Sequence, residues 1–229
     1  MVKKVELTQK QLAKMIDHTL LKATATPAQI EAVCQEALAI GAASVCINPV
    51  NVRQAAEILK GSDVKVCTVI GFPLGANTSA TKAFETSDAI AAGAQEIDMV
   101  IDIGALKAGI EGDVREDIKA VVKAADGVPV KVILETCYLT DEEKIVVCRV
   151  AAEAGASFVK TSTGFGTGGA TPDDVALMRA NIPPHMKVKA SGGMRSWQDA
   201  LPNIEAGADR LGVSASIAIL EGVNSTIEI

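Results

Sequence analysis

The sequence predicts an α/β fold, a single-domain (β/α)8 TIM barrel over residues 1–229. Three observations indicate this fold. A helical stretch that ends in a Gly-Ala phrase recurs four times, and apolar runs of a second kind lie between the copies. The length of 229 residues also suits one α/β barrel, and 48 % hydrophobic with only 3 % aromatic residues fits a core of Ala, Val and Ile layers.

The repeated phrase marks every second unit of strand and helix. It closes Ala- and Glu-rich helical stretches and leads into apolar runs, as expected of a glycine that ends a helix. Its glycines are 52, 62 and 52 residues apart, a spacing too long for one unit but suitable for two. The phrase stands at residues 40–42, 92–94, 154–156 and 206–208.

The units between these phrases open with short Val/Lys segments that follow turns. Such openings occur at residues 64–66, 130–132 and 187–188, the first two after Gly/Asp-containing turns at 61–63 and 126–129. With a short first strand, the count reaches eight, which predicts a closed parallel barrel. We expect strands at residues 16–20, 44–48, 64–70, 96–102, 130–136, 157–161, 187–190 and 209–213.

A doubly wound open sheet is the competing fold, because residues 164–169 match the G-x-G-x-x-G pattern of dinucleotide sites. In such sites the third glycine lies within the helix, and an acid follows about 20 residues later. Here the helix is expected to begin only after Thr171, with Pro172 at its first position, and the residue 20 places beyond Gly169 is Lys189. The pattern therefore favours a loop over a nucleotide fold.

Charge and hydropathy exclude several classes of partner. The net charge is -6 and no Lys/Arg run is longer than Lys3-Lys4, which argues against nucleic acid and against anionic membrane surfaces. The N-terminus lacks the apolar segment of a signal peptide, and no stretch approaches 18 uncharged apolar residues. We expect a cytoplasmic protein that binds neither nucleic acid nor membrane.

The cysteines and histidines suggest chemistry without a metal. The five cysteines form an odd set without a close pair, and four lie in apolar runs, so reduced core thiols are favoured over redox or metal-binding roles. His18 and His185 alone cannot form the histidine cluster of a catalytic zinc site. We expect neither a metal nor another cofactor.

Two lysines, Lys160 and Lys189, lie where expected strands six and seven meet glycine loops. Burial of an unpaired lysine is costly and lowers its pKa, which makes the amine a nucleophile. If both point into the barrel about 5 Å apart, repulsion of roughly 3 kcal/mol corresponds to about 2 pKa units and brings one amine near neutral pH. The alternative is that both reach solvent, as we expect for Lys65, Lys131 and Lys187 at the opposite rim.

Glycine loops follow the last two expected strands, where barrels often bind phosphate. Residues 191–194 (Ser-Gly-Gly-Met) follow strand seven, and residues 212–217 (Gly-Val-Ser-Ala-Ser-Ile) follow strand eight and resemble the start of a short helix. Glycine lets backbone N–H groups approach an anion, and a helix N-terminus adds free donors. Alternatively these glycines only turn the chain, but their coincidence at both positions favours a phosphate site.

Asp98 is a third candidate, because alternation along residues 96–102 sets Asp98, Val100 and Asp102 on one face of expected strand four. An inward Asp beside two lysines is suited to general acid/base catalysis or to positioning a water. A buried structural ion pair is the alternative. Glu135, at the end of expected strand five, cannot be ranked from its spacing.

Three motifs together resemble those of the deoxyribose-phosphate aldolases. They are Phe-Val-Lys-Thr-Ser-Thr-Gly-Phe at 158–165, Lys-Val-Lys-Ala-Ser-Gly-Gly at 187–193 and Glu-Ile-Asp-Met-Val-Ile at 96–101. Segments 16–21, 45–49 and 69–75 support the likeness, which runs from about residue 12 to 220. It implies a class I aldolase that reversibly cleaves 2-deoxy-D-ribose 5-phosphate to D-glyceraldehyde 3-phosphate and acetaldehyde, in deoxyribonucleotide catabolism.

The resemblance also implies roles for individual residues. Lys160 is then the Schiff-base lysine, and Lys189 is the second lysine, which lowers the pKa of Lys160. Asp98 is a member of the proton relay. Because relatives are dimers or tetramers, a homo-oligomer is expected. The family's phosphate-holding positions fall on Gly164, Gly192, Gly193 and Ser214, and its sugar-facing positions on Asp17, Thr19 and Cys46.

Two departures and two rival functions accompany this resemblance. Asp102 stands where short-chain relatives commonly carry Asn, and residues 225–229 lack the terminal Tyr that in some relatives assists protonation, since Tyr138 is the only tyrosine.

Another class I phospho-sugar aldolase and a catalytically silent phospho-sugar-binding barrel are the alternatives. Use of acetaldehyde as donor separates the first from the predicted enzyme, and binding without turnover identifies the second.

Overall fold

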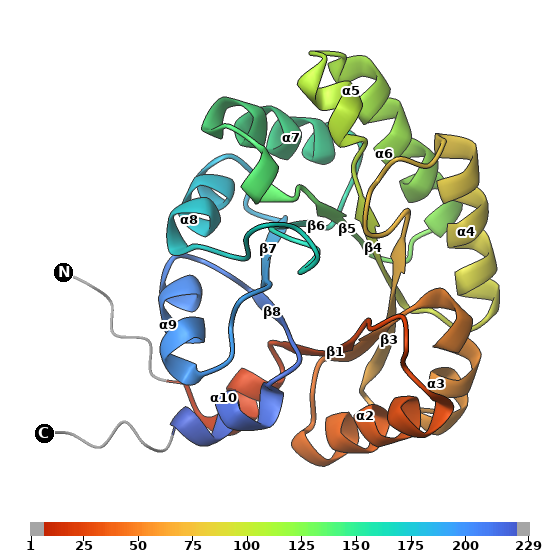
Figure 1. Cartoon of the computed structure of the whole chain (residues 1–229), viewed down its shortest axis with the longest axis vertical. Coiled ribbons are helices and arrows are strands. Elements are labelled where there is room, and N and C mark those ends of the chain that lie inside the picture. The colour runs from red at the N-terminus through yellow and green to blue at the C-terminus, as the bar shows by residue number, and fades with distance from the viewer. Residues whose placement is uncertain (1–6, 224–229) are drawn as a thin grey trace, which may run out of the picture.

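A closed barrel of eight parallel strands forms the centre of the molecule (Figure 1). The computed structural model describes residues 7–223. Neighbouring strands follow chain order, and β8 pairs with β1 to close the ring, with Ile16 beside Leu211. The strands are β1 (Ile16–Leu20), β2 (Ser44–Ile47), β3 (Lys65–Ile70), β4 (Glu96–Val100), β5 (Val130–Ile133), β6 (Phe158–Lys160), β7 (Lys187–Ser191) and β8 (Arg210–Val213).

Helices surround the barrel, as a ring outside the strands in Figure 1, which confirms the predicted (β/α)8 fold class. None of the helices within residues 7–223 has the length and apolar character that crossing a bilayer requires. The helices are α1 (Gln9–Ala13), α2 (Pro27–Ile40), α3 (Val52–Ile58), α4 (Ser79–Ala91), α5 (Ile103–Lys107), α6 (Glu111–Ala125), α7 (Asp141–Glu153), α8 (Pro172–Ala180), α9 (Trp197–Glu205) and α10 (Ser216–Val223), with single 3-10 turns η1 (Pro49–Asn51) and η2 (Thr136–Tyr138).

The repeated Gly-Ala phrase ends four helices by the same hydrogen-bonding device. Each glycine has a positive φ, from 67° at Gly41 to 117° at Gly93, a conformation that side chains on Cβ disfavour. The N–H of the alanine that follows donates to the carbonyl five residues earlier, at 3.0 Å in all four copies. The phrase therefore ends each helix and directs the chain into the next strand, as predicted.

The apolar core lies between the strands and the helices. Along β4, Ile97 and Met99 belong to this core, whereas Glu96 and Asp98 on the alternate positions point into the barrel. The same alternation holds in β7, where Val188 and Ala190 join the core and Lys189 ion-pairs inside the barrel. Hydrophobic burial outside the sheet thus leaves the barrel interior free for charged side chains.

Two expectations about strand-end side chains were wrong. Lys65 and Lys187 are exposed first residues of their strands, as predicted, but Lys131 is the second residue of β5 and is fully buried inside the barrel. Asp102 does not continue the inward face of Asp98, because β4 ends at Val100. Its carboxylate instead accepts a hydrogen bond from the N–H of Ala105 at 2.9 Å and caps α5.

Glycine at position 75 is required by contact as well as by conformation. Gly75 and Gly109 have nearly equal φ angles of 70° and 73°, but a Cβ on Gly75 would lie 1.8 Å from the carbonyl oxygen of Ile101, whereas one on Gly109 meets nothing within 4 Å. We expect Gly109→Ala to cost about 1 to 2 kcal/mol of unfolding free energy and Gly75→Ala more than about 4 kcal/mol. Urea unfolding measures both, and equal losses would contradict the steric explanation.

Candidate active site

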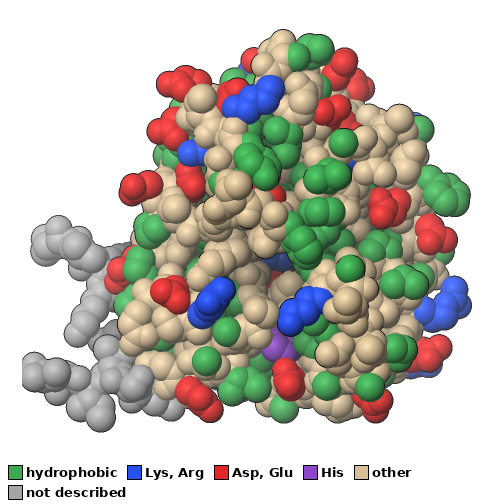
Figure 2. All heavy atoms as spheres, in the orientation of Figure 1, with side chains coloured by type: hydrophobic (Ala, Val, Ile, Leu, Met, Phe, Trp, Pro, Cys, Tyr) green, Lys and Arg blue, Asp and Glu red, His purple; other side chains and the backbone are tan. Residues whose placement is uncertain are grey.

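A pocket of about 320 Å³ opens at the carboxyl ends of the strands. Figure 2 shows a hollow near the middle of the molecular face, with Lys and Arg side chains beside it. The pocket is lined by segments that follow β1, β6, β7 and β8. Six of the ten predicted site residues line it, namely Thr19, Lys160, Gly164, Gly192, Gly193 and Ser214.

Lys160, Lys189 and Asp98 come together as the sequence predicted. The two lysines are direct neighbours across the β6–β7 ladder. Their Nζ atoms each lie 2.7 Å from the same oxygen, Oδ2 of Asp98. Lys160 lines the pocket, whereas Lys189 is fully buried and does not. One of the two amines is therefore open to a substrate, and the other acts from behind it.

The carboxylate of Asp98 is shared by three lysine side chains. Lys131, which the sequence analysis had placed at the opposite rim, donates to Oδ1 at 2.7 Å. Burial disfavours the charged carboxylate, but Lys131, Lys160 and Lys189 outweigh it and hold the pKa of Asp98 well below its usual range. Asp98 is accordingly an anion that organises the site.

A second layer of ion pairs lies on the side of Asp98 away from the pocket. Asp17 binds Lys189 at 2.5 Å and also accepts from Arg210, and Glu96 binds Lys131 at 2.7 Å and Arg210 at 3.2 Å. Burial opposes the charge on Lys189, yet Asp17 and Asp98 prevail and raise its pKa. The prediction of one amine near neutral pH therefore does not apply to Lys189, whose ammonium form these two acids favour.

Sequence reasoning missed Lys131, Glu96 and Arg210 as parts of this network. The available signal was position, because Glu96 and Asp98 alternate inward on β4 and Asp98 is in register with Lys131 on β5. The predicted sugar-facing residues Asp17 and Cys46 do not line the pocket. Both are fully buried beneath it, so they can act on a substrate only through neighbouring side chains.

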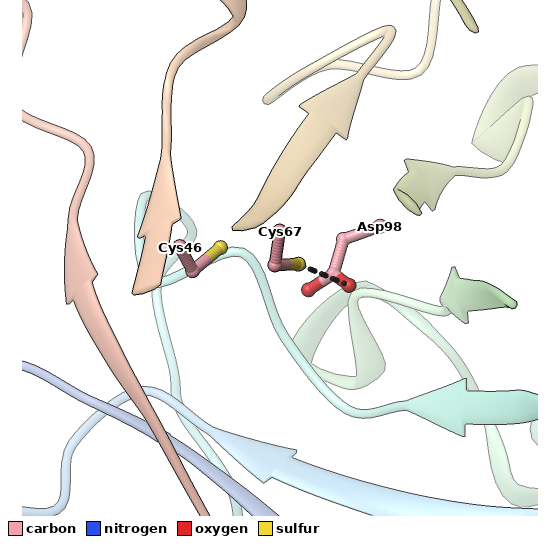
Figure 3. Close-up of side chains that lie close together, drawn as sticks. All are labelled: Cys46, Cys67 and Asp98. Atoms are coloured by element: carbon pink, nitrogen blue, oxygen red, sulfur yellow. Dashed lines mark hydrogen bonds between the residues drawn. The ribbon is translucent and has the colours of Figure 1, made fainter. Parts of the chain in front are cut away.

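The cluster of Cys46, Cys67 and Asp98 has donor atoms that metals bind, but Lys131 already lies beside it. Figure 3 shows Cys46, Cys67 and Asp98, whose ligand atoms lie within 4.8 Å of one another. Cys67 Sγ donates to Asp98 at 3.2 Å, and Lys131 Nζ lies 3.3 Å from that sulfur, so an ammonium group already supplies the positive charge there. Burial and neighbouring Cys46 and Asp98 raise the pKa of Cys67 well above its usual value, which disfavours the thiolate that metals bind.

The glycine loops form the wall of the pocket beside Lys160. Gly164, Gly192 and Gly193 line the pocket with φ angles of 84° to 85°, and without side chains they let a ligand approach the backbone. Ser214 lies two residues before α10, so the first turn of that helix begins at the pocket, as predicted. Backbone N–H groups and a helix N-terminus are donors suited to a phosphate group.

The electrostatic character of the pocket also suits an anion. The described lining residues include Lys22, Lys160 and Arg195 but no Asp or Glu, in a chain whose net charge is -6. Lys22 and Arg195 are exposed and follow β1 and β7, respectively. Sequence reasoning did not single out either residue, because isolated surface cations carry no distinctive spacing.

Comparisons with known proteins agree with this geometry. A family model described as DeoC/LacD family aldolase matches residues 11–222. A deoxyribose-phosphate aldolase of Clostridium perfringens is 64% identical over 94% of this chain and 97% of its own, and one of a Geobacillus species is 61% identical over 93% and 96%. A tetrameric deoxyribose phosphate aldolase structure from Aeropyrum pernix has a TM-score of 0.90, at 35% identity, over 96% of this chain and 94% of its own.

Removal of Lys131 tests whether the interior charges are mutually dependent. We expect Lys131→Met to lower the unfolding free energy by about 3 to 5 kcal/mol, because Asp98 and Glu96 lose a buried partner. Lys65→Met, at the exposed start of β3, is the matched control and should change it by less than about 0.5 kcal/mol. Urea unfolding at neutral pH compares the two, and similar small effects would contradict the buried network.

Proposed function

The chain belongs to the DeoC/LacD family of aldolases, and we propose that Lys160 forms the Schiff base through which it cleaves its substrate. Its reaction is the reversible conversion of 2-deoxy-D-ribose 5-phosphate to D-glyceraldehyde 3-phosphate and acetaldehyde, the activity of deoxyribose-phosphate aldolases. The observation that carries the assignment of Lys160 is its position. It reaches the pocket while its Nζ lies 2.7 Å from the buried Asp98.

The choice of Lys160 over Lys189 rests on access and on charge. A nucleophilic amine needs a free electron pair and a path to the substrate carbonyl. Lys189 has neither, since it is fully buried and Asp17 and Asp98 stabilise its ammonium form. We assign Lys189 the role of a fixed positive charge beside Lys160, because both amines contact the same oxygen of Asp98.

In the proposed reaction the Nζ of Lys160 adds to C1 of the open-chain sugar, and loss of water gives an iminium ion. A base accepts the proton of the C3 hydroxyl, the C2–C3 bond breaks, and its electron pair moves through the iminium to form an enamine. D-glyceraldehyde 3-phosphate leaves, the enamine takes a proton at C2, and water releases acetaldehyde and the free amine. Asp98, with Lys189 on the same oxygen, is the proposed path for these protons.

The phosphate group is proposed to lie against Gly164, Gly192, Gly193 and Ser214. Lys160 lines the same pocket as these four residues, so one open-chain sugar can place its phosphate on the loops and its C1 at Lys160. Asp17 and Cys46 are proposed to act beneath the substrate, where Asp17 holds Lys189 in place. Thr19 remains a proposed sugar contact from the end of β1.

Several sequence predictions extend beyond this site. A single domain over residues 1–229, a homo-oligomer and a cytoplasmic location stay predictions. Asp102 caps α5 and does not line the pocket, which supports a limited effect of its charge on the reaction. The chain end, residues 225–229, where the missing tyrosine was noted, lies outside the described residues.

Borohydride trapping tests the nucleophile. Incubation with acetaldehyde and borohydride should leave an ethyl group on Lys160, identified by peptide mass spectrometry, because reduction makes the imine permanent. Lys160→Leu should abolish both the adduct and the cleavage of 2-deoxyribose 5-phosphate, while Lys10→Leu on α1 is the matched control. An adduct on Lys189 would exchange the two proposed roles, and the absence of any adduct would overturn the Schiff-base mechanism.

The rim cation Lys22 should contribute to capture of the phosphate. At low ionic strength we expect Lys22→Met to lower kcat/KM for 2-deoxyribose 5-phosphate about fivefold, as loss of about 1 kcal/mol implies. Raising the salt concentration should shrink the difference because exposed charges are screened. Cleavage of unphosphorylated 2-deoxyribose should be unchanged, and Lys14→Met, beyond the other end of β1, should affect neither substrate.

A further inference from the structure

Glu135 is a buried acid that the proposed mechanism does not use. It follows β5, is only 2 % exposed, and makes no ion pair with any Lys, Arg or His among residues 7–223. Its backbone adopts the left-handed conformation, with φ 57° and ψ 64°, which is costly for a residue other than glycine. The strained backbone and the burial of a carboxyl group without a cationic partner both cost free energy, so the contacts of this side chain must offset both costs.

The carboxylate of Glu135 binds the start of the loop after β6. It accepts hydrogen bonds from the backbone N–H of Thr163 at 3.2 Å and from the hydroxyl of the same residue. That hydroxyl in turn accepts from the N–H of Phe165 at 3.0 Å. Glu135 therefore fixes three consecutive residues, 163–165, all of which line the pocket.

The rest of this loop is packed against the same turn. A Cβ on Gly166 would lie 2.9 Å from Cys137 Sγ and 3.1 Å from Glu135 Cδ, and one on Gly168 would lie 3.0 Å from Cys137 Cβ. Only glycine fits without a shift at these positions. The loop after β6 therefore packs directly against the turn formed by residues 135–138.

The opposite side of the loop after β6 contacts the glycine loop after β7. A Cβ on Gly169 would lie 2.4 Å from the carbonyl oxygen of Gly192, and the N–H of Ala170 donates to the carbonyls of Ser191 and Gly192. The loop after β6 is consequently held between the Glu135 turn and the loop after β7. A displacement of Thr163 would therefore move the loop after β6 and, through Gly169 and Ala170, the loop after β7.

Thr163 is hydrogen-bonded to Glu135 and accepts from the N–H of Phe165. This set of hydrogen bonds, the Glu135 clamp, also determines where Phe165 lies. Phe165 is 56 % exposed at the pocket and meets Phe72 of the loop after β3, with ring centroids 5.3 Å apart and planes at 87°. Edge-to-face pairs of this kind are attractive. Phe165 therefore bridges the mouth of the barrel from a loop that Glu135 anchors.

We propose that Glu135 is a positioning residue for phosphate binding, which acts through Thr163 to hold the loop after β6 against the loop after β7. This inference rests on the proposed function, because the bound phosphate is taken to be that of the substrate. Within the described residues, neither Glu135 nor Thr163 hydrogen-bonds to Asp98 or to the amines of Lys160 and Lys189. Loss of the Glu135 clamp should therefore affect binding of the phosphorylated end more than bond cleavage.

The test compares variants that separate the carboxylate from the backbone conformation. Glu135→Asn keeps a residue that tolerates the left-handed conformation but shortens the arm, and Thr163→Val removes the bridging hydroxyl while keeping the shape of the side chain. Glu135→Gln retains the length with one acceptor and should recover part of the function. Glu142→Asn, exposed on α7, is the matched control.

We expect Glu135→Asn and Thr163→Val to raise KM for 2-deoxyribose 5-phosphate at least tenfold with kcat within threefold of the original enzyme. KM for unphosphorylated 2-deoxyribose should stay within twofold. Equal losses for both substrates, or a lowered thermal midpoint with no change in KM, would overturn the proposal and leave a structural role. Calorimetric titration with inorganic phosphate gives an independent readout, in which an unchanged affinity would also overturn it, even if the original enzyme failed to cleave the sugar.

Discussion

The whole barrel interior depends on one carboxylate that three lysine side chains share. Asp98 lies 2.7 Å from Lys131, Lys160 and Lys189, and each of these lysines is buried. Removal of charges from water costs several kcal/mol per ion, and only close pairing with further hydrogen bonds offsets that cost. Asp17 pairs with Lys189 and Glu96 with Lys131, so each of these two cations has a second acidic partner.

Strand alternation makes this arrangement compatible with a stable fold. Each strand turns one set of side chains toward the helices, where the apolar core lies, and the other set toward the barrel axis. The outer layer supplies hydrophobic burial, and the inner layer can therefore hold groups chosen for chemistry. The helix stops at Gly41, Gly93, Gly155 and Gly207 return the chain to the strands and keep the two layers aligned.

Local patterns predicted most of the fold and the central part of the site. Repeated glycine stops and the Val/Lys openings between them indicated the number of units. Lys160 and Lys189 were found because they lie where expected strands meet glycine loops, and Asp98 because strand alternation sets it on an inward face. Lys131 was misplaced because burial of a strand-opening lysine depends on a shift of one residue, which the motif alone does not settle. Glu135 could not be ranked either, since its partner Thr163 is 28 residues away and its role arises only from the meeting of two loops.

The interior charges are distributed unequally along the chain. In the part of the chain that the structure describes, the acids of the interior ion-pair network, Asp17, Glu96 and Asp98, belong to the first four strands. Its basic residues, Lys131, Lys160, Lys189 and Arg210, belong to the last four. Each half-barrel alone would bury charges of a single sign, which repel one another and lack counter-ions. Neither half-barrel can therefore keep water out of its own interior. Assembly of the two halves should be an all-or-none event, in which the catalytic centre and the folded state appear together.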